Sequence, residues 1–332
     1  MQEDILLRDR KGFKIGVIIL LIIFLFIAFL VGNIKGTLKV EPKRIFEVIM
    51  TDDGSPERMV IWNIRLPRMI LAALVGTNLA LSGAILQGVM KNPLADPSII
   101  GISSGAGLFG IVVLVVFPQY IGLVPIAAFI GAMFAAFLIY ILSWKGGIQT
   151  TRIILAGVAV SALFGAGISG ILVFYSDRVH GALTFMNGSL SSRSWPEVWT
   201  ILPYTIAGFI LVNVFAEKLN ILVLGDDVAR GVGLNVEATR LGFTALAAFL
   251  AASAVSVVGL LGFVGLIVPH SIRLIMGNDY KYMFPATALL GSVLLMFSDT
   301  FARTFLSPTE IPVGIVMAVV GAPFFLFLLR RE

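Results

Sequence analysis

Residues 15–32, IGVIILLIIFLFIAFLVG, form 18 consecutive uncharged and almost wholly apolar residues near the start of the chain. A helix needs about 20 such residues to cross roughly 30 Å of bilayer hydrocarbon. A cleaved signal peptide is the alternative, but its apolar region is usually shorter, and no A-x-A-like cleavage site follows this run. The run therefore predicts a first transmembrane helix that the mature chain retains.

Apolar runs recur along the whole chain, which is 58% hydrophobic, only 13% charged and has a mean hydropathy of +1.00. A soluble fold could not bury this much apolar surface, so we expect an all-α integral membrane protein with one transmembrane domain over residues 1–332. The ten predicted spans cover residues 15–33, 67–90, 97–117, 121–143, 152–175, 197–216, 241–259, 262–277, 283–303 and 312–329.

An even number of spans places both termini on the same side of the membrane. Lysine and arginine concentrate in the cytoplasmic loops of membrane proteins. They flank the spans at both ends of this chain, at Arg8, Arg10, Lys11, Lys14, Arg330 and Arg331. We therefore expect a multi-pass protein of the cell membrane, with residues 1–14 as a cytoplasmic tail and both termini inside the cell.

Residues 34–68 break this charge rule. They are external under the predicted topology, yet they hold seven basic residues, namely Lys35, Lys39, Lys43, Arg44, Arg58, Arg65 and Arg68. Either the topology is wrong, or these charges meet an external partner. For Arg65 and Arg68, contact with lipid headgroups is a further interpretation.

Asp299 and Arg303 lie four residues apart near the outer end of the predicted span 283–303. This spacing places both side chains on one helix face, where they can form an ion pair. A carboxylate inside a membrane also suggests a proton relay, but the neighbouring arginine favours a structural pair.

The segment LGDDVARGVGLNVEATRLG, residues 224–242, is a polar island in this apolar chain. Asp226 and Asp227 can accept the free N–H groups at a helix start, and Gly231 or Gly233 can end a helix in a left-handed conformation. One or two short helices are therefore expected. Such short helices are not stable alone in water, so the segment must rest on something else.

The segment MKNPLADPSIIGISSGAG, residues 90–107, predicts a hard cytoplasmic turn. Pro93 disfavours helix at the residue before it, and Asp96 can cap a new helix whose first position is Pro97. The small and polar residues that follow are tolerated inside a membrane only where they are buried in protein or line a cavity. A role in lining a pathway and a simple capping role are both open.

Small residues recur four apart on three predicted spans, and such stripes usually serve close helix packing. The stripes are Gly76, Ala80, Ala84 and Gly88; Gly157, Ser161, Gly165 and Ser169; and Thr244, Ala248, Ala252 and Ser256.

Motifs for enzymatic chemistry are lacking in the sequence. The chain has no cysteine, its two histidines are far apart, and it contains neither an H-E-x-x-H metal motif nor a G-x-x-x-x-G-K-[ST] nucleotide loop. We expect no catalytic residue, no metal and no cofactor. If ATP drives this protein, another chain must bind it.

The order of five blocks resembles the FecCD family of permeases over nearly the whole chain after the first span. The blocks are RLPRMILAALVGTNLALSGAILQGVMKNPLADPSIIGISSGAG, RIILAGVAVSALF, LGDDVARGVGL, GLLGFVGLIVPHSIRL and EIPVGIVMAVVGAPFFLFLL. Members belong to ATP-binding-cassette (ABC) importers for iron–siderophore complexes, haem and cobalamin in bacterial cell membranes. The resemblance implies ten spans, a second permease subunit in a homodimer or a paralogous heterodimer, two cytoplasmic ATPases and an extracytoplasmic binding protein.

Residue roles follow from the matching motifs of the family. Within a cytoplasmic coupling segment at 217–240, the resemblance implies ATPase contact through Gly225, Asp226, Ala229 and Gly233. It implies that the binding protein docks on outward arginines at Arg65, Arg68 and Arg303. It also implies a cytoplasmic gate at Asn92 and Leu94, with a second gate segment at Thr150 and Thr151.

For the cargo we expect a ferric siderophore, with haem or cobalamin as the alternative inside the family. Membrane lipid is an expected partner and nucleic acid is not. An ion-coupled secondary transporter is the alternative of another class, and it would use Asp299 and broken helices without partner chains. A membrane-embedded enzyme would need a cluster of ionisable residues at one depth, and the sequence shows none.

Overall fold

The computed structural model describes residues 11–36, 40–51, 53–98, 100–144 and 150–330, and its regular elements are helices. The N-terminal half contains α2 (Lys11–Ile34), α3 (Pro42–Met50), α4 (Pro56–Val60), η1 (Ile61–Arg65), α5 (Leu66–Met90), α6 (Ile102–Ile111), η2 (Val112–Val116), η3 (Pro118–Leu123), α7 (Val124–Ser143) and α8 (Thr150–Phe174). The C-terminal half contains η4 (Ser176–Arg178), α9 (Val179–Asn187), α10 (Trp195–Val214), α11 (Ala216–Val223), α12 (Asp226–Gly231), α13 (Val236–Val258), α14 (Val264–Met276), α15 (Tyr280–Thr304) and α16 (Val313–Leu329).

Each predicted span corresponds to one apolar helical segment. Seven of these segments are long and apolar enough to cross a membrane, by length and composition. The other three, Ile102–Val116, Val264–Met276 and Val313–Phe327, are shorter. The predicted all-α membrane fold is thus confirmed. Arg8, Arg10, Lys39 and Arg331 lie outside the described residues, as does most of the predicted tail.

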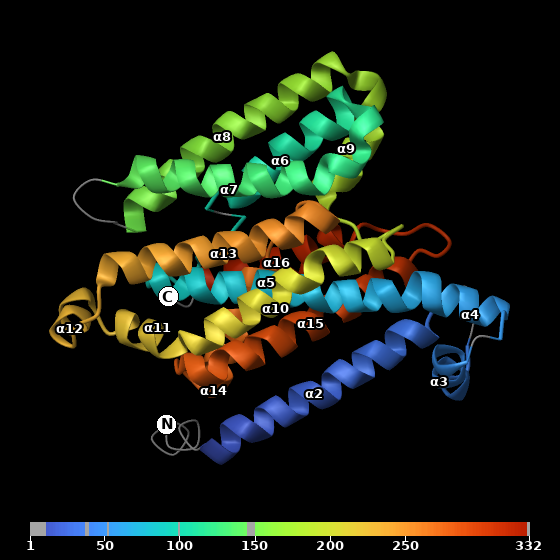
Figure 1. Ribbon diagram of the computed structural model, residues 1–332, viewed down its shortest axis with the longest axis horizontal. Coiled ribbons are helices and arrows are strands. Elements are labelled where there is room, and N and C mark those ends of the chain that lie inside the picture. The colour runs from blue at the N-terminus through green and yellow to red at the C-terminus, as the bar shows by residue number, and fades with distance from the viewer. Residues whose placement is uncertain (1–10, 37–39, 52, 99, 145–149, 331–332) are drawn as a thin grey trace.

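Helix α5 occupies the centre of the molecule, with α10, α13, α14 and α15 around it (Figure 1). Its small residues allow backbones to touch, because a Cβ atom at Gly76 would lie 2.2 Å from the carbonyl oxygen of Gly291. A Cβ at Gly83 would lie 2.0 Å from that of Gly265. Close packing is therefore the structural role of the stripe on α5.

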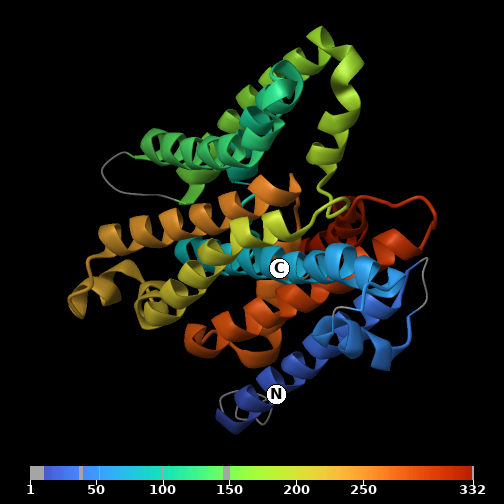
Figure 2. The same ribbon diagram turned by 45° about the vertical axis from the view of Figure 1, so that its right-hand side comes forward.

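Helices α6 to α9 form a wing that diverges from this central group, and α8 lies at its outer edge (Figures 1 and 2). Helix α2 lies on the opposite edge. In the apolar 18-residue stretch of each helix, only 22% of the residues of α8 and 17% of those of α2 are buried. In the segment that contains α5 the share is 78%. The stripe on α8 is used in part, because Gly157 packs on the Ile100 backbone whereas nothing lies within 4 Å of a Cβ at Gly165.

Candidate functional site

The turn after α5 is stabilised by its own polar side chains. The helix ends at Lys91 with a left-handed φ of 50°, and Asn92 Oδ1 then accepts the N–H of Leu94 at 2.9 Å. Asp96 Oδ1 accepts the N–H of Ser98 at 2.8 Å. The predicted helix start at Pro97 is wrong, because α6 begins only at Ile102, after a Gly101 whose φ of 97° breaks the helical path.

A cleft of about 650 Å³ lies where the wing meets the C-terminal helices. It is lined by Ser98, Ser103, Ser104, Ser161, Met186, Asn187, Leu260, Leu261, Gly262, Phe263, Gly314, Ile315, Ala318 and Val319. None of these described residues carries a charge. Ser103 is 7% exposed, and its hydroxyl has no hydrogen-bond partner among the described residues. The cleft thus offers hydroxyl and amide groups on an otherwise apolar wall.

The predicted gate residues do not line this cleft. Leu94 is half-buried against the apolar cluster that contains α14 residues. The side-chain oxygen of Asn92 accepts a hydrogen bond within the turn. Thr151 is exposed in the first turn of α8, and the side chain of Thr150 lies outside the described residues. A gating role for these four residues stays a prediction.

The polar island does form a short helix, α12, at one end of the molecule next to α11 (Figure 1). Gly225 precedes it with a φ of 127°, and Gly233 follows it with a φ of 83°. The predicted capping by the two aspartates is wrong, because Asp226 binds other helices and Asp227 points into solvent with its side chain fully exposed.

Asp226 ties α12 to two membrane helices. Its carboxylate accepts from Arg240 of α13 at 2.9 and 3.0 Å and from Lys91 at the end of α5 at 3.3 Å. Partial burial alone would raise the pKa of Asp226, but the hydrogen bonds and positive charges of Arg240 and Lys91 outweigh it, so that the pKa is lowered. The short helix therefore gains an anchor that its own hydrogen bonds could not supply.

Ala229, one of the residues matched to ATPase contact, is 0% exposed and belongs to the apolar core. The exposed apolar residues of the segment are instead Leu224 at 70%, Val228 at 49% and Val232 at 64%. Sequence reasoning missed these three, although apolar residues that recur every four positions in a polar segment indicate apolar contacts with a partner. Leu224 ends α11, whereas Val228 lies on α12 and Val232 directly follows it.

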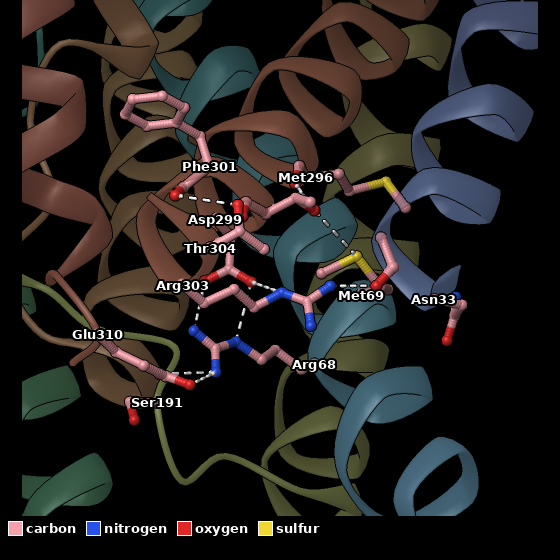
Figure 3. A network of polar contacts seen from close by, with 12 residues as sticks. Asn33, Arg68, Met69, Ser191, Met296, Asp299, Phe301, Arg303, Thr304 and Glu310 are labelled. Carbon is pink, nitrogen blue, oxygen red and sulfur yellow. Dashed lines mark hydrogen bonds and ion pairs between the residues drawn. The ribbon is translucent and has the colours of Figure 1, made fainter. Parts of the chain in front are cut away.

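Arg68 lies in a buried charge network near the opposite end of α5 (Figure 3). Its guanidinium donates to both carboxylate oxygens of Asp299 on α15, at 2.9 Å each, and to Glu310 at 2.9 and 3.2 Å. Asp299 is 0% exposed and lies 4.0 Å from the nearest guanidinium nitrogen of Arg303. The geometry favours the structural pair over a proton relay, with Arg68 as the main partner.

Arg65 and Arg68 were predicted to face outward but are buried, and Arg303 is half-buried. Arg65, 3% exposed, donates to the Asn33 carbonyl at 2.6 Å, and Arg303 donates to the Gly32 carbonyl. The C-terminal carbonyls of α2 bind Arg65 and Arg303, and the carboxylates of Asp299 and Glu310 bind Arg68. The sequence indicated only the pair of Asp299 with Arg303. The role of the three arginines in docking a binding protein stays a prediction.

Comparison with known proteins shows where the chain belongs. The model of the FecCD transport family matches residues 20–331. The Fe(3+)-citrate import system permease protein YfmE of Bacillus subtilis is 40% identical over 98% of this chain and 97% of its own length. The cobalamin import system permease protein BtuC of Halobacterium salinarum is 43% identical over 83% of this chain and 75% of its own.

Among solved structures, an inward-facing conformation of a metal-chelate type ABC transporter aligns with a TM-score of 0.85. It is 27% identical and covers 96% of this chain and 99% of its own. The family match and the first relative cover nearly the whole chain, as does the solved structure. The chain belongs to the FecCD transport family.

Proposed function

We propose that this chain is the transmembrane permease subunit of an ABC importer that carries ferric chelates, with a ferric siderophore as the cargo. The observation that carries the proposal is the match over almost the full length to an Fe(3+)-citrate import permease. The uncharged cleft supports it, since its serine hydroxyls can hydrogen-bond the oxygen-rich surface of a chelate without trapping it by charge. The cobalamin and hemin relatives cover less of both chains, and haem or cobalamin stays the alternative cargo.

A second permease subunit would complete the pathway. The cleft lies between the wing and α16, and apolar side chains of α8 and α16 beside it are exposed, among them Leu163 at 64% and Val319 at 69%. A second copy placed against these faces would bury them and convert an open cleft into a closed passage. A paralogous permease with a similar face would do the same.

ATPase subunits would bind at α12. The exposed apolar side chains of the coupling segment need a partner, and the tie from Asp226 to α5 and α13 connects that partner to the membrane helices. This end of the molecule also holds the start of α2, where Lys14 lies 3.8 Å from Asp279. We infer that this end is cytoplasmic, and that an extracytoplasmic binding protein approaches the end where the Arg68 network lies.

Uptake in reconstituted vesicles tests the function. The chain is to be reconstituted with its ATPase and presented with a binding protein loaded with ferric siderophore, ferric citrate or cobalamin. We expect uptake of radioactive iron that requires both ATP and the ATPase. Uptake that needs no ATPase but follows a proton or sodium gradient would instead establish the secondary transporter, and uptake of cobalamin alone would correct the cargo.

A further inference from the structure

A second cavity, unrelated to the cargo cleft, lies between α10 with α11 on one side and α13 on the other. These helices run side by side on one face of the molecule (Figure 1). The cavity has a volume of about 540 Å³. Its lining consists of Leu211, Phe215, Lys218, Gly233, Leu234, Asn235, Ala238, Thr239, Gly242, Phe243 and Leu246.

The lining changes from polar to apolar along α13. Asn235 and Thr239 lie at the start of the helix, whereas Phe243 and Leu246 lie further in. The stretch of α13 from its start at Val236 to Leu246 is about 15 Å long at 1.5 Å per residue. This is close to half of the roughly 30 Å hydrocarbon thickness, or one lipid leaflet. An occupant that fits must be apolar over that depth and polar at one end.

The polar end of the cavity is positively charged. Lys218 is exposed and stacks on the Phe215 ring at 4.9 Å, and it forms no ion pair with a carboxylate among the described residues. The two nearest acidic residues on the same helices are engaged elsewhere. Glu217 lies 3.9 Å from Lys281, and Glu237 lies within 4.0 Å of both Arg230 and Arg240.

Gly242 keeps the apolar part of the cavity open. It lies on the cavity wall, and nothing lies within 4 Å of the position where its Cβ would be. A Cβ at this position would therefore clash with no described atom. A cavity with an apolar wall about one leaflet long, next to a lysine that forms no ion pair among the described residues, matches the chemistry of an anionic phospholipid.

We propose that this cavity binds an anionic phospholipid, with an acyl chain along Phe243 and Leu246 and the phosphate at Lys218. Basic pockets between membrane helices at the cytoplasmic surface bind acidic headgroups in this way. The site touches Gly233 and Leu234 of the coupling segment, so an occupied site stabilises the loop that connects α12 to α13. The proposal rests on the membrane fold and on the cytoplasmic orientation proposed above for this end, and it is independent of the cargo.

Native mass spectrometry on protein extracted from equimolar phosphatidylcholine and phosphatidylglycerol tests this site. We expect retained phosphatidylglycerol on the wild-type chain. Lys218→Gln should lower the ratio of bound phosphatidylglycerol to phosphatidylcholine about fivefold, the effect of one basic residue near an acidic surface. Gly242→Leu should reduce binding of both lipids because its side chain fills the cavity.

Two matched variants serve as controls. Lys11→Gln removes an exposed lysine at the same end of the molecule, and Gly16→Leu adds the same side chain to an open, exposed position on α2. Both should retain wild-type lipid. Equal binding of the two lipids by the wild-type chain, or wild-type retention in both Lys218→Gln and Gly242→Leu, would overturn the proposal. Retention of a protein segment or second copy instead of lipid would do so too.

Discussion

At the residue scale, the sequence predicts ion pairs between residues close in the chain but not those between distant residues. The spacing of Asp299 and Arg303 predicted an ion pair, and the pair exists, although the shorter contact of Asp299 is to Arg68. That partner is 231 residues away in the chain, so no local spacing could indicate it. Ala229 was expected to face a partner, but it is buried because α12 packs on the core through that side.

The buried Arg68 network should be essential for stability. Arg68→Leu leaves the buried Asp299 carboxylate with only its longer contact to Arg303. Breaking a buried pair costs about 3–5 kcal/mol. We expect a large fall in the apparent melting temperature of the detergent-solubilised protein. Lys43→Leu, an exposed change in the same chain segment, should have little effect. The double variant Arg68→Leu with Asp299→Leu should recover part of the loss, and an equally unstable double variant would contradict the ion-pair explanation.

Asp226 should make the stability of the folded chain depend on pH. Its pKa is lowered in the folded state, so its contribution to stability is complete above the ordinary carboxyl value of about 3.9 and is lost as the pH falls through the lowered pKa. We therefore expect the wild-type chain to melt at a higher temperature than Asp226→Asn near neutral pH. The difference should disappear in acid, as thermal unfolding across a pH series will show. A difference that grows as the pH falls would contradict the assignment.

At the element scale, hydropathy placed the spans because the bilayer requires long apolar helices, and their boundaries agree with the structure within a few residues for most of them. The start of α6 was placed too early, because the turn around Asp96 and Gly101 outweighs the helix-start signal at Pro97. Helices α3 and α4 were not predicted at all. They are short, and their residues carry no span-length apolar run.

A substitution on the exposed face of α12 should impair coupling to the ATPase more than it impairs folding. Val228 is 49% exposed, so Val228→Glu should leave the permease inserted and stable while weakening ATPase association and ATP-driven uptake. Ala229→Glu, one residue further, buries a charge and should reduce the yield of folded protein. Size-exclusion chromatography and ATPase copurification separate the two outcomes. Normal copurification and uptake in Val228→Glu would show that this face is not the contact.

At the scale of the whole molecule, the two faces beside the cleft should meet a second subunit. The chain has no native cysteine, so single cysteines report on proximity without background. If the permease is a homodimer, Val319→Cys on α16 should form cross-linked dimers in membranes under mild oxidation. Ile19→Cys, which is 53% exposed on α2 at the opposite edge, should not. Cross-linking of both variants to the same extent would indicate random collision, and a paralogous partner would leave Val319→Cys monomeric in chains expressed alone.

Helix α5 has an ion pair to another helix near each of its ends. It has 25 residues and is therefore about 38 Å long. Close to its start, Arg68 fastens it to α15, and just past its end Lys91 fastens it to α12. If α12 is the ATPase contact proposed above, a displacement of α12 can reach the opposite end of the molecule through α5, and none of the residues of α5 itself lines the cleft. Under that proposal, coupling to the ATPase and passage of the cargo use different helices of the same chain.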